Sequence, residues 1–306
     1  MSSTPLGPNA PEPQPAPPQA PQPGVIPLRP LSFSEIIGGA FATLRRYPKV
    51  LFGTALVAVG VPNVVSYLVS WVMLLGIDPA VFQPGVPNAQ RAAAPVAILV
   101  ASLVGAVLAI MVLLAAEVVI AGFTTIVVSQ AVLGKDITVG KAWERLRARM
   151  WPLVGVTVLY IICVFAGTIL CLVPGVWVGV LFALATPALV LEQVGVGQAF
   201  QRSKVLMRDA WWQTFGILVV TWLIVSAFSL IIQLPLSFAG SATSFLTLDA
   251  GTPQSPSLGM MLVALAAEIF VGTVTYPFIA AVTALLYIDR RIVRERLDLQ
   301  LAEAAA

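Results

Sequence analysis

Most of the chain consists of long apolar stretches that are nearly free of charge. Three of them contain no charged residue at all: 50–76, 152–191 and 210–248. Two others contain one acidic residue each, Glu117 in 92–134 and Glu268 in 250–288. About 20 apolar residues in a helix cross the roughly 30 Å of hydrocarbon in a bilayer. The pattern predicts an all-α integral membrane protein with six transmembrane helices, near 50–76, 95–133, 152–172, 175–192, 212–238 and 259–288.

The apolar run 95–133 is twice as long as one span requires, and the positive charges decide how it is used. As one span, it leaves 16 of the 17 Lys and Arg residues on the side of both termini, with only Arg91 opposite. Splitting it into two spans would place five basic residues on the wrong side, against the positive-inside rule. We therefore expect one long helix here and both termini in the cytoplasm. Pro174 and Gly175 divide the run 152–191 into two spans.

Composition supports a membrane protein and excludes familiar enzyme classes. Of the 306 residues, 58% are hydrophobic and 10% are charged, whereas soluble domains carry roughly 25% charged residues. The chain has no His and only two Cys, which excludes histidine-based catalysis and a zinc site built from these ligands. We expect no enzymatic activity, catalytic residue, cofactor, metal or nucleic-acid partner, and a location in the plasma membrane.

The two ends of the chain differ from the membrane part. Residues 1–30 contain 11 of the 24 prolines and have no apolar periodicity, which is typical of a disordered tail. We expect this tail to be cytoplasmic. Residues 31–288 form the predicted membrane domain. Residues 289–306 are expected to continue the last span as a cytoplasmic helix or tail.

A short pattern recurs before the first, third and fifth spans. It begins with Ala and an aromatic residue and ends with a cation at the sixth position, in residues 40–45, 142–147 and 199–204. Its apolar positions fall on one face of a helix. Ser32 and Glu35 form a Ser-x-x-Glu capping box before the first copy, and Thr138 can cap the second. We therefore expect three units, each an amphipathic interfacial helix followed by a pair of spans.

These amphipathic helices suit the membrane surface. We expect their aromatic side chains, Phe41, Trp143 and Phe200, to lie at headgroup depth. The cations Arg45, Arg147 and Lys204 would then face anionic lipid. The alternative is that these helices only orient the spans that follow them.

Glu117 and Glu268 are the only ionisable residues well inside predicted spans. Their surroundings echo each other, since each follows Ala-Ala and precedes a Thr by seven residues, Thr124 and Thr275. A charge inside the bilayer is costly, so such residues usually face a protein interior or a water-filled path. One hypothesis is a proton-coupled or cation-binding pair. The other is that protonated Glu side chains tie helices together through hydrogen bonds.

Two stretches of the chain resemble a known family. The first runs from Ile26 to Pro48 and includes Arg29-Pro30-Leu31-Ser32-Phe33-Ser34-Glu35, and the second runs from Tyr287 to Leu299. Both are similar to actinobacterial membrane proteins that carry the glycerophosphoryl diester phosphodiesterase membrane domain. The resemblance implies a multi-span domain without an assigned activity. The soluble phosphodiesterase fused to it in some relatives requires His, so no catalytic residue carries over to this chain.

Two functions remain open from the sequence. The first is a membrane scaffold or accessory subunit that contacts lipids and either a protein partner or a second copy. The alternative is a small transporter or lipid-handling permease that uses Glu117 and Glu268. A transporter requires a continuous polar path between helices.

Overall fold

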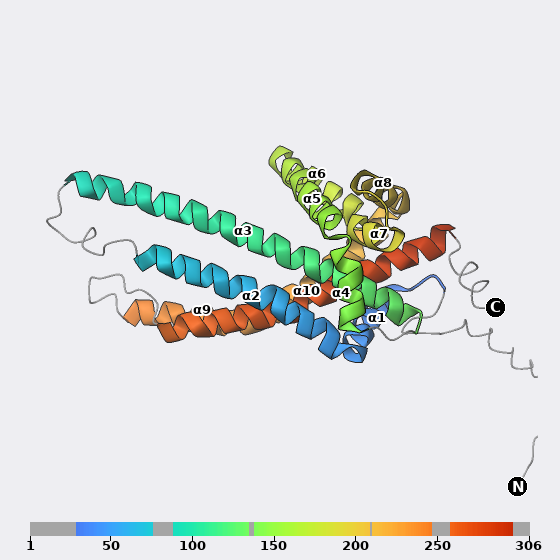
Figure 1. Ribbon diagram of the computed structural model, residues 1–306, viewed down its shortest axis with the longest axis horizontal. Coiled ribbons are helices and arrows are strands. Elements are labelled where there is room, and N and C mark those ends of the chain that lie inside the picture. The colour runs from blue at the N-terminus through green and yellow to red at the C-terminus, as the bar shows by residue number, and fades with distance from the viewer. Residues whose placement is uncertain (1–28, 76–87, 135–137, 209, 247–257, 296–306) are drawn as a thin grey trace, which may run out of the picture.

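The computed structural model describes residues 29–75, 88–134, 138–208, 210–246 and 258–295, and over these ranges it contains helices and no strand (Figure 1). The all-α membrane fold predicted from the sequence is confirmed. The Pro-rich segment 1–28 and residues 296–306 lie outside the described residues.

The first unit consists of one short and two long helices. Helix α1, Phe33–Arg46, begins at the N-cap Ser32, and the predicted capping box with Glu35 is present. The Ser32 N–H donates to Glu35 at 2.7 Å. This bond, with the Ser32 hydroxyl, lowers the pKa of Glu35. Helix α2 is Pro48–Leu75, and α3 is one continuous helix, Asn88–Val132.

The second unit is shorter and contains a break. Helix α4, Val139–Arg147, begins after Thr138, whose side chain makes no capping hydrogen bond. Helix α5, Met150–Leu170, is followed by α6, Leu172–Phe182, and α7, Ala185–Glu192. The predicted single span 175–192 is therefore two helices in line. Pro187 explains the break, because in a continuous helix its ring would clash with the carbonyl of residue 183.

The third unit repeats the plan of the first. Helix α8, Val196–Met207, precedes α9, Trp211–Leu246, and α10, Leu258–Glu295. Helix α10 continues through Pro277, and most of its residues from Val271 to Ile292 are buried. This half of α10 is the centre of the hydrophobic core.

Several described segments are long and apolar enough to cross a membrane. Five meet both criteria of length and composition, and a shorter apolar segment, Ala116–Val132, belongs to α3. Helices α6 and α7 count as one of the five, Leu172–Glu192. The protein is therefore a multi-pass membrane protein.

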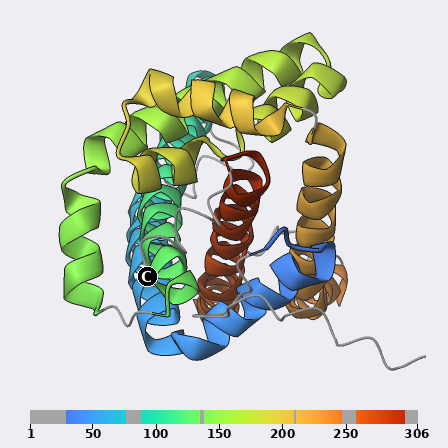
Figure 2. The ribbon, with the colours of Figure 1, turned by 90° about the vertical axis from the view of Figure 1, so that its right-hand side faces the viewer.

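The three units are arranged cyclically. Helix α4 packs on α3, α8 packs on α6 and α7, and α1 packs on α10. Each short helix thus rests on the last helix of the preceding unit, and α1 closes the ring. Figure 2, which looks onto this end of the molecule, shows α1 (blue), α4 (green) and α8 (gold) on three sides of α10 (red). This arrangement agrees with the repeat predicted from the sequence.

Candidate functional site

The repeated pattern of the short helices is a packing pattern. Its first residue, Ala40, Ala142 or Ala199, is fully buried in all three copies. The residue four positions later, Leu44, Leu146 or Ser203, is also buried. Ser203 replaces Leu because its hydroxyl donates to the carbonyl oxygen of Leu181 at 2.7 Å. The Ala and the residue one turn later therefore form the face that docks on the spans.

The aromatic residues of the pattern do not all behave alike. Phe41 and Trp143 are 48% and 44% exposed, which leaves them free to contact lipid. The Phe41 ring also lies 4.7 Å from that of Phe278 in α10. Phe200, in contrast, is only 9% exposed and packs edge-on against Phe182 at 4.8 Å. The prediction that Phe200 faces lipid is therefore wrong, because α6 covers this side of α8.

The cations of the pattern remain at the surface. Arg45, Arg147 and Lys204 are all exposed, at the end of the molecule shared by the three short helices. Their contact with anionic headgroups stays a prediction.

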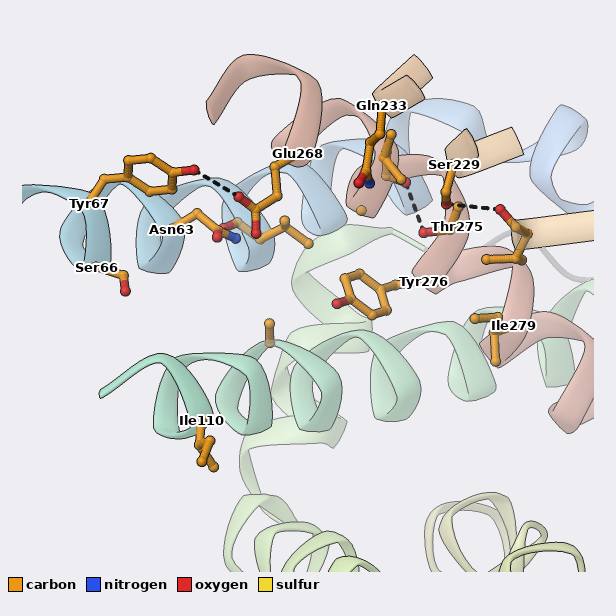
Figure 3. Close-up of a pocket in the computed structure, with 15 residues that line it drawn as sticks. Asn63, Ser66, Tyr67, Ile110, Ser229, Gln233, Glu268, Thr275, Tyr276 and Ile279 are labelled. Carbon is orange, nitrogen blue, oxygen red and sulfur yellow. Dashed lines mark hydrogen bonds between the residues drawn. The ribbon is translucent and has the colours of Figure 1, made fainter. Parts of the chain in front are cut away.

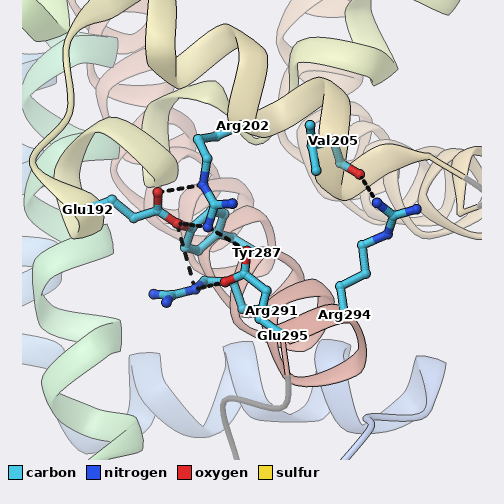
Figure 4. Close-up of polar contacts among 7 residues, drawn as sticks. All are labelled: Glu192, Arg202, Val205, Tyr287, Arg291, Arg294 and Glu295. Carbon is cyan, nitrogen blue, oxygen red and sulfur yellow. Dashed lines mark hydrogen bonds and ion pairs between the residues drawn. The ribbon is translucent and has the colours of Figure 1, made fainter. Parts of the chain in front are cut away.

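A partly buried ionic network joins the second and third units (Figure 4). Glu192, at the end of α7, accepts hydrogen bonds from Arg202 Nε at 2.6 Å and Nη2 at 2.5 Å, and from the Tyr287 hydroxyl. Arg202 Nη2 also lies 2.6 Å from Glu295 Oε1. The bond to Glu192 raises the pKa of Arg202, which stays charged. The network holds α7, α8 and α10 together.

Sequence reasoning missed this network because its members lie on three helices that are distant in the chain. Arg294 extends it by donating to the carbonyl oxygens of Val205 and Arg208 at 2.6 and 3.0 Å. These carbonyls end α8, so the contact caps that helix. The arrangement is structural, since every charge in it is already satisfied from within the chain.

A second polar region lies among the long helices and surrounds a cavity of about 700 Å³ (Figure 3). Helices α2, α3, α9 and α10 line it. Its polar residues are Asn63, Ser66, Tyr67, Ser229, Gln233, Glu268, Thr275 and Tyr276. A second cavity of about 440 Å³ shares Tyr67, Gln233 and Glu268 with the first. These three side chains therefore line both cavities and lie where the two adjoin.

Glu268 is positioned by the contact between α2 and α10. The Tyr67 hydroxyl of α2 donates to Glu268 Oε2 at 3.3 Å, as Figure 3 shows. One turn along α10, Gly272 allows the two helices to approach closely, because a Cβ there would lie 2.9 Å from Val59 Cγ1. The missing side chain of Gly272 thus brings Tyr67 within reach of Glu268.

The other intramembrane candidates are distributed unevenly around this site. Thr275 lines the cavity, but its hydroxyl donates to the Val271 carbonyl of its own helix at 2.8 Å. Glu117 and Glu268 are both exposed, but Glu117 lines neither cavity, and Thr124 is buried in the core. Of the two acidic residues singled out by the sequence, only Glu268 belongs to the cavity. Tyr276 is within electrostatic reach of both.

The cavity occupies a defined depth along the helices. Tyr67 lies 19 residues after Pro48, and Glu268 lies 20 residues before Ile288, which corresponds to about 30 Å of helix in each case. Val59 and Ile279 lie 11 residues after Pro48 and 9 before Ile288, or about 15 Å. The cavity therefore extends along the long helices from about 15 Å to about 30 Å away from Pro48 and Ile288.

Helix arrangement and cavity together define a class: a polytopic α-helical membrane protein with a polar cavity between its spans. A family model described as Domain of unknown function (DUF7847) matches residues 151–289. The match covers α5 to α9 and most of α10, including Gln233 and Glu268, but not α2 with Tyr67. No curated protein and no solved structure matches the chain. The comparisons give no support to the glycerophosphoryl diester phosphodiesterase membrane-domain resemblance.

Over the described residues, no group of three or more His, Cys, Asp or Glu side chains could hold a metal ion. Cys163 and Cys171 are free, and neither lines the two cavities. The chemistry of the site is therefore that of one carboxylate with neutral hydroxyl and amide groups around it.

Proposed function

We propose that this protein is a non-enzymatic permease that binds a small or lipid-like molecule in the cavity around Glu268. The cavity volume of about 700 Å³ lies within the range of ligand sites in proteins, about 300–1,000 Å³. Polar side chains from three helices converge on it. A carboxylate inside a membrane span is costly and usually marks a binding site or pathway.

The observation that carries the proposal is the shared position of Tyr67, Gln233 and Glu268 in two adjoining cavities. Together the cavities bring polar side chains of α2, α9 and α10 around Glu268. A scaffold does not require such a cavity. The exposed cations Arg45, Arg147 and Lys204 favour a contact with anionic lipid in addition, and a permease can make that contact as well.

We place the protein in the plasma membrane with both termini in the cytoplasm. The positive-inside rule supports this orientation, since 16 of 17 basic residues fall on that side. The cavity then opens toward the outer face. The resemblance of Ile26–Pro48 and Tyr287–Leu299 to the glycerophosphoryl diester phosphodiesterase membrane domain remains part of the proposal, and it adds no activity.

Native mass spectrometry of the protein extracted with its own lipids tests the proposed function. We expect a specific small molecule or lipid to remain bound to the wild-type chain and to be lost from the Glu268→Gln variant. Glu117→Gln is the matched control, because it removes the same charge from a side chain that lines neither cavity. We expect it to retain the ligand.

Two outcomes would contradict the proposal. One is a stoichiometric protein partner with no small molecule bound, which is the result expected of a scaffold. The other is equal loss of ligand in both variants. The thermal unfolding temperatures of the two variants show whether any loss reflects unfolding.

A further inference from the structure

The cavity lies where α2 and α9 both pack on α10. Over the described residues, α2 and α9 form no extensive interface with each other. Tyr67 of α2 and Gln233 of α9 stand on the two sides of Glu268. Leu68 and Leu234, which follow Tyr67 and Gln233 in the sequence, are exposed apolar side chains on the same two helices. An entrance between these helices would let a molecule come from the bilayer without crossing the headgroup region.

The lining combines polar and apolar side chains, as an amphiphile would require. Tyr67, Gln233 and Glu268 form a polar group that both cavities share. Val59, Val225, Val271 and Ile279 add apolar surface to the larger cavity, next to the polar Ser229, Thr275 and Tyr276. A site of this kind offers contacts to both the head and the chain of an amphiphile.

The charge of the site indicates which kind of head group an amphiphilic ligand would carry. Glu268 is the only charged side chain among the residues that line the two cavities. Around it are neutral groups that can accept hydrogen bonds, Asn63, Ser66 and Gln233, and the rings of Tyr67 and Tyr276. A carboxylate with aromatic faces nearby is the pattern that binds ammonium groups. An anionic head group would be repelled by Glu268, and the residues that line the two cavities include no cation to compensate.

We propose that the occupant is an amphiphile with a cationic, amine-derived head and an alkyl chain, which enters from the outer leaflet between α2 and α9. This inference rests on the proposed function and names its ligand class. The head pairs with Glu268, and the chain lies along Val225, Val271 and Ile279.

Three compounds with the same twelve-carbon chain separate the contributions of head and chain: dodecyltrimethylammonium, dodecanol and dodecanoate. Each is added below its micellar concentration to the full chain in a neutral maltoside detergent, and the unfolding temperature is followed against concentration. We expect the ammonium compound to bind most tightly. The Glu268→Gln variant should weaken its binding about ten- to a hundredfold, as for a lost charge-assisted bond, and leave dodecanol unchanged. Glu117→Gln should bind all three as the wild type does.

The possible failures are distinguishable. If dodecanoate binds as well as the ammonium compound, or if Glu268→Gln weakens dodecanol equally, the inferred head group is wrong while a cavity ligand remains. If none of the three compounds shifts the unfolding temperature of the wild-type chain, while native mass spectrometry finds another ligand, only this inference fails. If neither experiment detects a ligand, the proposed function fails as well.

Discussion

Glu117 and Glu268 are both exposed, but only Glu268 lines the cavities and meets Tyr67 across the contact between α2 and α10. The two acids have nearly the same neighbours in the chain, Ala-Ala before and Val or Ile after. Their different surroundings come from the helices that pack beside them. At the residue scale, therefore, the surroundings of each carboxylate depend on the facing helix and not on the local sequence.

The aromatic position of the repeat gives a test of the packing. Phe200 is buried against Phe182, whereas Phe41 is half exposed. We expect Phe200→Ala to lower the free energy of unfolding by about 3–5 kcal/mol, the usual cost of emptying a buried Phe site. Phe41→Ala should cost clearly less, because much of its ring has no protein contact to lose. Chemical denaturation in detergent measures both, and equal losses would contradict the burial described for Phe200.

At the element scale, the hairpin of α5 and α6 depends on closely packed glycines. A Cβ on Gly175 would lie 2.9 Å from the backbone Cα of Thr168, and one on Gly167 would lie 3.0 Å from the Cα of Gly175. Backbone atoms cannot move aside as a side chain can. Small residues that let helices approach are common in membrane proteins, and this pair explains how two short helices form a tight hairpin.

Substitution of Gly175 tests this contact. We expect Gly175→Ala to destabilise the protein by about 1–3 kcal/mol, since overpacking forces the helices apart. Gly179→Ala on the same helix is the control. A Cβ there would meet its nearest atom, the Tyr160 hydroxyl, at an ordinary 3.6 Å. A comparison of thermal unfolding in detergent would contradict the account if the two variants lost the same stability.

Much of the arrangement of the helices along the chain could be predicted from the sequence. Charge-free runs marked the spans, and the distribution of Lys and Arg favoured one helix in the region where α3 continues for 45 residues. Helices α6 and α7 lie within one candidate span, Leu172–Glu192, with Pro187 near the break between them, whereas Pro277 is tolerated within the continuous α10. The partners Tyr67 and Gln233 were missed. Each is one of several scattered polar residues, and only the packing of α2 and α9 beside α10 brings them to Glu268.

At the scale of the whole molecule, the three units are unequal. Helices α2, α3, α9 and α10 have 28, 45, 36 and 38 residues, whereas α5 has 21. In Figure 1, the four long helices extend together away from the end where the short helices lie. The cavity lies among these four. Val271, Gly272 and Thr275 of its lining belong to the buried half of α10, so the cavity borders the hydrophobic core.

The central claim is that a polar cavity opens at the outer half of the membrane beside Glu268. Cysteine labelling tests it most directly. With Cys163 and Cys171 replaced by Ser, single variants Gln233→Cys and Ile231→Cys are made on α9. Gln233 lines the cavity, whereas Ile231 is 73% exposed and lines neither cavity. The two positions lie two residues apart, so their depth in the bilayer is nearly the same.

Intact cells that express each variant are treated with a membrane-impermeant thiol reagent. The account predicts rapid labelling at residue 233 and little or none at residue 231, because only the first faces water that enters from outside. It would be contradicted if residue 233 reacted as slowly as residue 231, or only after the cells were made permeable.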